Sequence, residues 1–169
     1  MYFRILILSF FLVFFSIKCY GEPDSSIINN KRLVITSSSL VLSLGASYYY
    51  IENSWWSDQS ASFHFDQGQD QIYALNVDKC GHFLGGIHSS NVFKSAMKWT
   101  GMSERRSLLY AGFFGSALQL AIELKDAYSP YWGFSKWDFS LGSAGAFYPL
   151  LQNKYSDLDA VNFKFSYFR

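Results

Sequence analysis

The longest uncharged segment of the chain after its N-terminal region, Leu33–Ile51, limits what the chain can fold into. Its length is close to the roughly 20 apolar residues that a membrane-spanning helix needs, although serine interrupts it repeatedly. Basic residues precede it and aromatic residues gather at and beyond its end, as at a membrane interface. If an upstream signal is removed, however, the flanking charges oppose the positive-inside rule. The segment is therefore either a bilayer span or a helix that is buried or lies on a membrane.

Three further segments have the residue pattern of helices. The first begins near Asp70 and continues towards Trp99, and the second follows Ser103, a favourable N-cap residue. The third begins at Ser135, and Pro149 is expected to bend or end it. Small residues occupy positions 111, 112, 115 and 116 of the second of these helices and positions 142, 145 and 146 of the third. They predict that these two helices pack at close range.

Two short segments, 62–66 and 161–167, alternate between polar and apolar residues as strands do. A single strand is not stable by itself, so the two segments either pair with each other or lack a partner in this chain. The predicted fold class is therefore all-α: a membrane-associated bundle of about four apolar helices with a small two-stranded β element.

The N-terminus has the pattern of a signal peptide. A basic residue near the start is followed by the apolar run Ile5–Ile17 and by Gly21, after which cleavage is expected. An uncleaved anchor is the alternative, and lipid attachment at Cys19 is disfavoured because Lys18 precedes it. The expected organisation is a signal peptide at 1–21, a flexible lead-in at 22–32 and a single helical domain at 33–169.

Charge, cysteine and apolar content narrow the classes of partner. The 169 residues include 14 Lys or Arg and 13 Asp or Glu, so the chain lacks the basic excess with which proteins bind nucleic acid. Removal of the signal peptide leaves Cys80 as the only cysteine, which predicts a small buried thiol rather than a disulfide. Because 50% of the residues are apolar, the expected partner is membrane lipid, and the sequence identifies no protein partner.

Six ionisable residues lie in or at the ends of the apolar helices. Asp78 and His82 are four residues apart, so they share one face of a helix. Glu123 and Asp138 each lie where an apolar segment ends or begins, and antiparallel packing brings such ends together. A buried carboxylate is costly unless it is paired. The group therefore forms the candidate polar site, with the members Asp78, Lys79, His82, Glu123, Asp126 and Asp138.

The residue types in this group allow two roles. One imidazole and three carboxylates suit a divalent cation such as manganese, iron or zinc, with the candidate ligands Asp78, His82, Glu123 and Asp138. Helical metal motifs with two histidines or Glu-x-x-His are not present, so no cofactor is firmly predicted. The other role is structural: a buried polar network that fixes the packing of three helices, in which Asp138 caps its helix together with Ser135.

Three short motifs follow one another in the chain. They are Asp-Lys-x-Gly-His at 78–82, Ile-Glu-x-x-Asp at 122–126 and Trp-Gly-Phe-Ser-x-x-Asp at 132–138. In this order they resemble the bacterial envelope family named domain of unknown function 2279, which includes YfiM-like predicted lipoproteins. The family is more distantly similar to VanZ-like membrane proteins.

The resemblance spans about Ile51 to Lys164. It implies that the six candidate residues are recurrent polar positions of the family, and it implies a location and an architecture rather than a reaction. Two residues depart from the family pattern. Ala127 stands where the family usually has glycine, and Gly142 stands where it usually has asparagine. A site that needs this asparagine amide is therefore not expected in this chain.

The sequence predicts an exported, membrane-associated protein at the periplasmic side of the bacterial cell envelope, in which the polar network has a structural or binding role. An enzyme is not favoured, because Gly-x-Ser-x-Gly, phosphate-loop and Cys-x-x-Cys motifs are not present. The alternative is an envelope enzyme, with or without a metal, that acts on a lipid or cell-wall intermediate. This alternative depends on the likeness to VanZ-like proteins.

Overall fold

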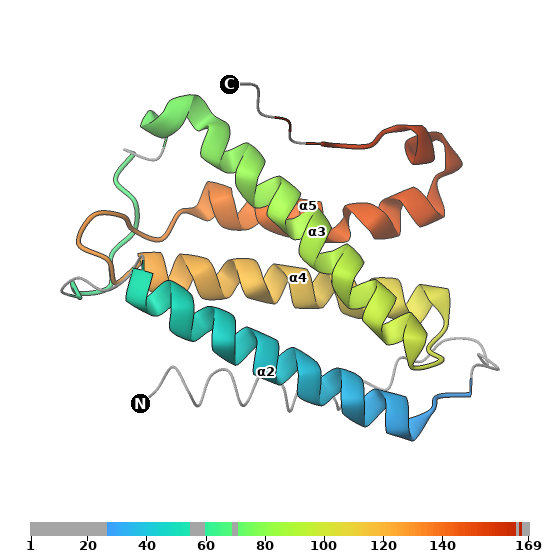
Figure 1. The fold of residues 1–169 in the computed structure, drawn as a ribbon. Coiled ribbons are helices and arrows are strands. Elements are labelled where there is room, and N and C mark those ends of the chain that lie inside the picture. Colours follow the sequence, from blue (N-terminus) through green and yellow to red (C-terminus); the bar gives the residue numbers. More distant parts are fainter. Residues whose placement is uncertain (1–26, 55–59, 69–70, 165, 167–169) are drawn as a thin grey trace.

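The computed structural model describes residues 27–54, 60–68, 71–164 and 166, and these are mainly helical (Figure 1). The prediction of an all-α fold with about four helices is confirmed. The predicted signal peptide lies outside these residues. The helices, including two short 3-10 helices, are α2 (Asn30–Ser54), η1 (Tyr73–Asn76), α3 (Val77–Trp99), α4 (Glu104–Asp126), α5 (Lys136–Lys154) and η2 (Ser156–Ala160).

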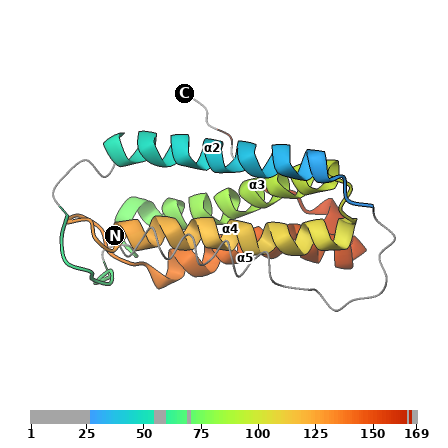
Figure 2. The same cartoon turned by 90° about the horizontal axis from the view of Figure 1, so that it is seen from below.

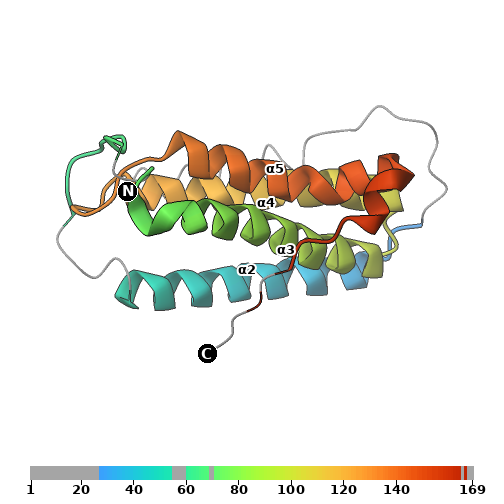
Figure 3. The ribbon, with the colours of Figure 1, turned by 90° about the horizontal axis from the view of Figure 1, so that it is seen from above.

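A three-helix bundle forms the body of the molecule, and α2 lies along one side of it (Figures 2 and 3). α4 runs antiparallel to both α3 and α5, so the N-terminal ends of α3 and α5 lie at the same end of the bundle as the C-terminal end of α4. Phe93, Met97 and Ala111 form a buried apolar cluster, against which Leu40 of α2 packs.

Two of the described helices, α2 and α4, are long and apolar enough to cross a membrane. In the most apolar part of α4, 44% of the residues are buried inside the molecule. In the most apolar part of α2, 6% are buried. α4 is therefore a core helix of the bundle. The alternative that Leu33–Ile51 is a buried helix is wrong, because Thr36 is the buried residue of α2 and most of the others are exposed.

The start of α3 differs from the prediction. The sequence pattern places a helix start near Asp70, which is outside the described residues, but the α-helix begins at Val77 after η1. Leu75 and Asn76 have φ values of 53° and 63°, a left-handed conformation through which an α-helix cannot continue. Asp78 therefore falls in the first turn of α3, where the helix dipole favours a carboxylate.

The start of α5 is as predicted, and of the two effects expected of Pro149, a bend or an end of the helix, the structure excludes the end. The Ser135 hydroxyl precedes the helix and accepts a hydrogen bond from the Asp138 amide at 3.2 Å. Pro149 does not end α5, which continues to Lys154. A proline inside a helix removes one main-chain hydrogen bond. Pro149 is nevertheless one of the buried residues of α5.

The described residues contain no strand, so the predicted two-stranded β element is not found among them. Phe65 forms a single parallel bridge with Phe134, whose amide donates to the His64 carbonyl at 3.0 Å. Residues 161–164 are not in a strand, and Phe163 instead packs against Phe83 with ring centroids 5.0 Å apart. Phe163 therefore packs against α3 instead of pairing in a strand.

The first turns of α3 have one side open to solvent. Cys80 is exposed, so the prediction of a buried thiol is wrong. A Cβ atom on the neighbouring Gly81 would have no other atom within 4 Å, which shows that this side of α3 faces away from the bundle.

Further along α3, glycines bring its backbone into direct contact with that of α5. A Cβ atom on Gly86 would collide with the Gly142 carbonyl oxygen and lie 2.7 Å from the Ala146 amide nitrogen. A Cβ atom on Gly145 would collide with a main-chain carbonyl of α3. Gly115 of α4 lies against Ala146, as the small residues predict, but the contact between main-chain atoms is between α3 and α5.

We expect Gly86→Ala to destabilise the fold by about 1–3 kcal/mol, because the added methyl group collides with main-chain atoms. Gly81→Ala is the matched control on the same helix. Its methyl group enters open space, and alanine improves helix propensity by up to about 1 kcal/mol. Denaturant unfolding of both variants measures the difference, and equal free energies of unfolding would contradict the close contact.

Candidate functional site

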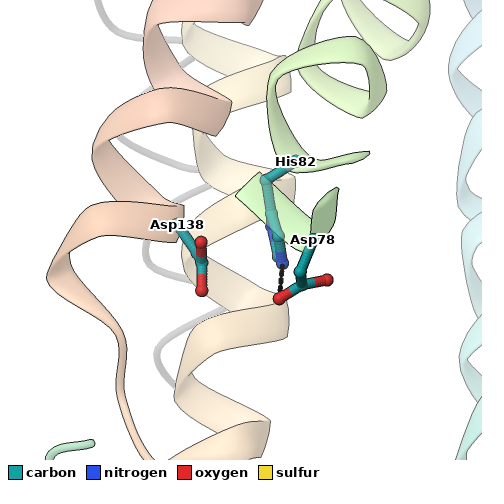
Figure 4. Close-up of side chains that lie close together, drawn as sticks. All are labelled: Asp78, His82 and Asp138. Atoms are coloured by element: carbon teal, nitrogen blue, oxygen red, sulfur yellow. Dashed lines mark ion pairs between the residues drawn. The ribbon is translucent and has the colours of Figure 1, made fainter. Parts of the chain in front are cut away.

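Ionisable side chains from three helices converge at one end of the bundle, and Figure 4 shows those from α3 and α5. Asp78 and His82 come from the start of α3, Glu123 from the last turn of α4 and Asp138 from the first turn of α5. In Asp78, His82 and Asp138, one possible ligand atom of each side chain lies within 4.8 Å of the other two. The structure thus brings together the ends that antiparallel packing predicts to converge.

His82 is held in one orientation by α4. Its Nδ1 atom lies 2.8 Å from Oε1 of Gln119, so Nδ1–H donates a hydrogen bond to this amide oxygen. The other ring nitrogen, Nε2, lies 3.8 Å from Oδ2 of Asp78 and 3.7 Å from Oε1 of Glu123. Because Nδ1–H donates to Gln119, the other ring nitrogen, Nε2, is the one that faces the two carboxylates.

Glu123 is buried, with 2% of its surface exposed. Its Oε2 atom accepts a hydrogen bond from the Ser135 amide at 2.9 Å. The pKa of Glu123 is raised from 4.5 to about 7, chiefly by burial; the Ser135 amide and His82 oppose this rise, and the charges of Asp126 and Asp138 add to it. Glu123 therefore exchanges its proton near neutral pH, as general acids and bases do.

Asp138 is buried beside the ammonium group of Lys79. Its Oδ1 atom lies 3.7 Å from Lys79 Nζ, and the dipole of α5 favours a carboxylate in this first turn. Asp126, the remaining predicted residue, lies at the end of α4 and acts on Glu123 through its charge. It does not belong to the group of three residues that Figure 4 shows.

The sequence analysis missed Gln119, which is buried and orients His82. A Cβ atom on Gly142 would lie 2.5 Å from Gln119 Cγ, so Gln119 occupies the space that a side chain at 142 would need. Gly142, which departs from the family pattern, supplies no amide, and the amide of Gln119 from α4 lies beside it. The available signal was a single amide one helical turn before Glu123 in an otherwise apolar segment.

An open hollow lies next to the polar group. Its volume is about 320 Å³, and its lining residues are Gln71, Asn76, Lys79 and Trp137. Lys79 belongs both to the hollow and to the ion pair with Asp138. The polar group is therefore connected to solvent through a polar surface.

Comparison with known proteins identifies the family. The family model described as "Predicted periplasmic lipoprotein (DUF2279)" matches residues 66–154, which include all six candidate residues. The chain belongs to this family. Its location at the periplasmic side of the cell envelope follows from the family description, as the sequence predicted. No match was found among curated proteins or among solved structures.

Two predictions are not tested by the family description: the likeness to VanZ-like proteins and the absence of lipid attachment. The likeness to VanZ-like proteins stays a prediction. The word lipoprotein implies lipid attachment to an N-terminal cysteine, for which Cys19 is the candidate that Lys18 disfavours, and both residues lie outside the described part of the chain.

We expect stability to fall as the pH rises from about 4.5 to about 7, because the folded state holds the Glu123 proton more tightly than the unfolded state. The stabilisation from the Glu123 proton is complete below this pH range and lost above it. Within the range, the free energy of unfolding falls by at most about 1.4 kcal/mol per pH unit. Glu123→Gln removes the titration and keeps an acceptor for the Ser135 amide. The variant should therefore flatten the profile and be more stable than wild type above neutral pH.

Denaturant unfolding across this pH range, with a chelator present, measures both profiles. A wild-type profile with the same slope as that of Glu123→Gln would contradict a raised pKa at Glu123.

Proposed function

We propose that this protein binds membrane lipid at the periplasmic side of the envelope through the outer face of α2. The observation that carries the proposal is the exposure of apolar side chains along this helix: Val34 is 65% exposed, Val41 57%, Leu42 73% and Tyr49 73%. Their spacing of seven or eight residues puts them on one face. An exposed apolar strip of this kind is typical of a helix that lies in a membrane interface.

Contacts at both of its ends support a fixed position for α2. At its start, the Arg32 guanidinium donates to the Trp99 carbonyl at 3.3 Å and lies 5.3 Å from the centre of the Trp99 ring. Near its end, Glu52 Oε2 lies 2.5 Å from Lys125 Nζ. Because the helix is attached at both ends, its outer face stays turned away from the bundle.

The residues around this strip favour lipid over a protein partner. No charged residue occurs within Leu33–Ile51, and Lys31 lies exposed just before it. Exposed aromatic side chains at Tyr49 and Tyr50 lie at the other end. Apolar residues bounded by basic and aromatic side chains match the layers of a membrane interface.

We expect Leu42→Asp to weaken binding of the purified chain to vesicles of phosphatidylethanolamine and phosphatidylglycerol at least tenfold. A leucine transferred from water into an apolar layer contributes about 1.5–3 kcal/mol, and a charge opposes insertion. Flotation of the protein with vesicles measures the binding. The control is Leu151→Asp, which changes an exposed leucine of α5. The helix α5 lies on the side of the bundle away from α2 (Figures 2 and 3).

Two results would contradict lipid binding by α2. One is an equal loss of binding in Leu42→Asp and Leu151→Asp. The other is a wild-type protein that does not bind vesicles and forms a dimer that Leu42→Asp separates, because a second copy of the chain would then cover this face.

In this proposal the polar group has a structural role, which is to join the ends of α3, α4 and α5. Lys79 with Asp138 links α3 to α5, His82 with Gln119 links α3 to α4, and the Ser135 amide with Glu123 links the start of α5 to α4. These contacts hold together helix ends that carry buried polar atoms, which supports fixed packing at this end of the bundle.

A double-mutant cycle on Lys79 and Asp138 tests this structural role. We expect Lys79→Met to cost about 3–5 kcal/mol, because it leaves the buried Asp138 carboxylate without the ammonium group, and Asp138→Asn to recover much of this loss in the double variant. Thermal unfolding of the four proteins in a chelator measures the coupling. Additive effects would show that the two side chains act independently.

A second candidate function is an envelope enzyme that acts on a lipid or cell-wall intermediate. It is favoured by the raised pKa of Glu123 beside His82, at the end of the bundle next to the open hollow. Mass spectrometry of envelope lipids and cell-wall precursors in cells with wild-type or Glu123→Gln protein tests it. An intermediate that accumulates in cells with the folded variant supports an enzyme, and identical profiles contradict it.

A further inference from the structure

The polar group brings three carboxyl groups and one imidazole to a poorly solvated end of the bundle. His82 Nε2 lies 3.8 Å and 3.7 Å from carboxylate oxygens of Asp78 and Glu123, and the Lys79 ammonium group lies 3.7 Å from Asp138 Oδ1. Glu123 and Asp138 are 2% and 3% exposed, so solvent compensates little of any charge on them. Buried carboxylates in this setting are stabilised when they bind a cation.

The orientation of His82 points to the same conclusion by a separate route. Gln119 Oε1 accepts a hydrogen bond from Nδ1–H, so Nε2 faces Oδ2 of Asp78 and Oε1 of Glu123. Three such atoms that face one another are stabilised by a proton or by a metal ion between them. A histidine that donates one ring N–H to a fixed oxygen and offers the other nitrogen is the usual arrangement of a metal ligand.

We propose that His82, Asp78 and Asp138 form a binding site for one divalent transition-metal ion, with Glu123 as a further carboxylate ligand and Gln119 as the positioning residue of His82. The residues that Figure 4 shows come from two helices, and their possible ligand atoms lie within 4.8 Å of one another. Nitrogen and oxygen ligands bound at about 2.0–2.2 Å are roughly 3–4 Å apart. Small side-chain rotations on fixed backbones therefore suffice to complete the site.

The ligand set determines the class of metal. An imidazole nitrogen disfavours calcium and magnesium, which take oxygen ligands, and the absence of thiolate from the group disfavours copper(I). Zinc and manganese fit one nitrogen with two or three carboxylates. The hollow beside Lys79 gives such an ion a path from solvent. The site is independent of lipid binding, because α2 contributes no ligand to it.

Isothermal titration of the purified full chain, stripped of metal by a chelator and then titrated with Zn²⁺ or Mn²⁺ alone, tests the proposal. We expect one ion per chain. Asp78→Asn and His82→Ala should each weaken binding at least tenfold, and Gln119→Leu should weaken it about 10–100-fold without removal of a ligand. His88→Ala is the matched control, because this exposed histidine lies on the same helix outside the group.

Asp78→Asn keeps the test valid if buried substitutions prevent folding, because the Asp78 side chain is 39% exposed. Its metal-free circular dichroism spectrum and melting temperature should match those of the metal-free wild type. The proposal is overturned by the absence of saturable binding with one ion per chain, by binding that the folded Asp78→Asn leaves unchanged, or by binding that His88→Ala abolishes.

Discussion

Direct contact between the backbones of α3 and α5 is the constraint on which the rest of the structure depends. Gly86 and Gly145 have no side chains to hold the two helices apart, so main-chain atoms of the two helices touch. Because the helices run in the same direction, their N-terminal ends lie at the same end of the bundle (Figure 1). Asp78 and His82 thereby lie beside Asp138. A larger residue at either glycine would push α3 and α5 apart. The side chains of the polar group would then move away from one another, although none of them is substituted.

The direction of the three helices also determines the electrostatics of the site. Asp78 and Asp138 lie in the first turns of their helices, where the positive end of the dipole stabilises a carboxylate. Glu123 lies in the last turn of α4, where the dipole has the opposite sign. Its burial raises its pKa, and one main-chain amide, that of Ser135, opposes this effect. Glu123 therefore exchanges its proton near neutral pH.

Features that depend on residue spacing were predictable from the sequence, and features that depend on backbone conformation or on contacts between helices were not. The shared face of Asp78 and His82 follows from helical periodicity, and their approach to Asp138 follows from antiparallel packing. The start of α3 depends on a positive φ at Leu75, which its residue type disfavours. Gln119 was missed because a single amide in an apolar helix has no pattern that distinguishes a buried hydrogen-bond acceptor from an exposed side chain.

The contact between Gln119 and Gly142 has a consequence for relatives of this protein. The two positions share one volume across α4 and α5, because a side chain at 142 would overlap the amide of Gln119. A related chain with asparagine at the position of Gly142 must therefore have a shorter residue at the position of Gln119, or its helices must lie further apart. Substitutions at these two positions should be correlated among related sequences, with the amide group exchanged from one helix to the other.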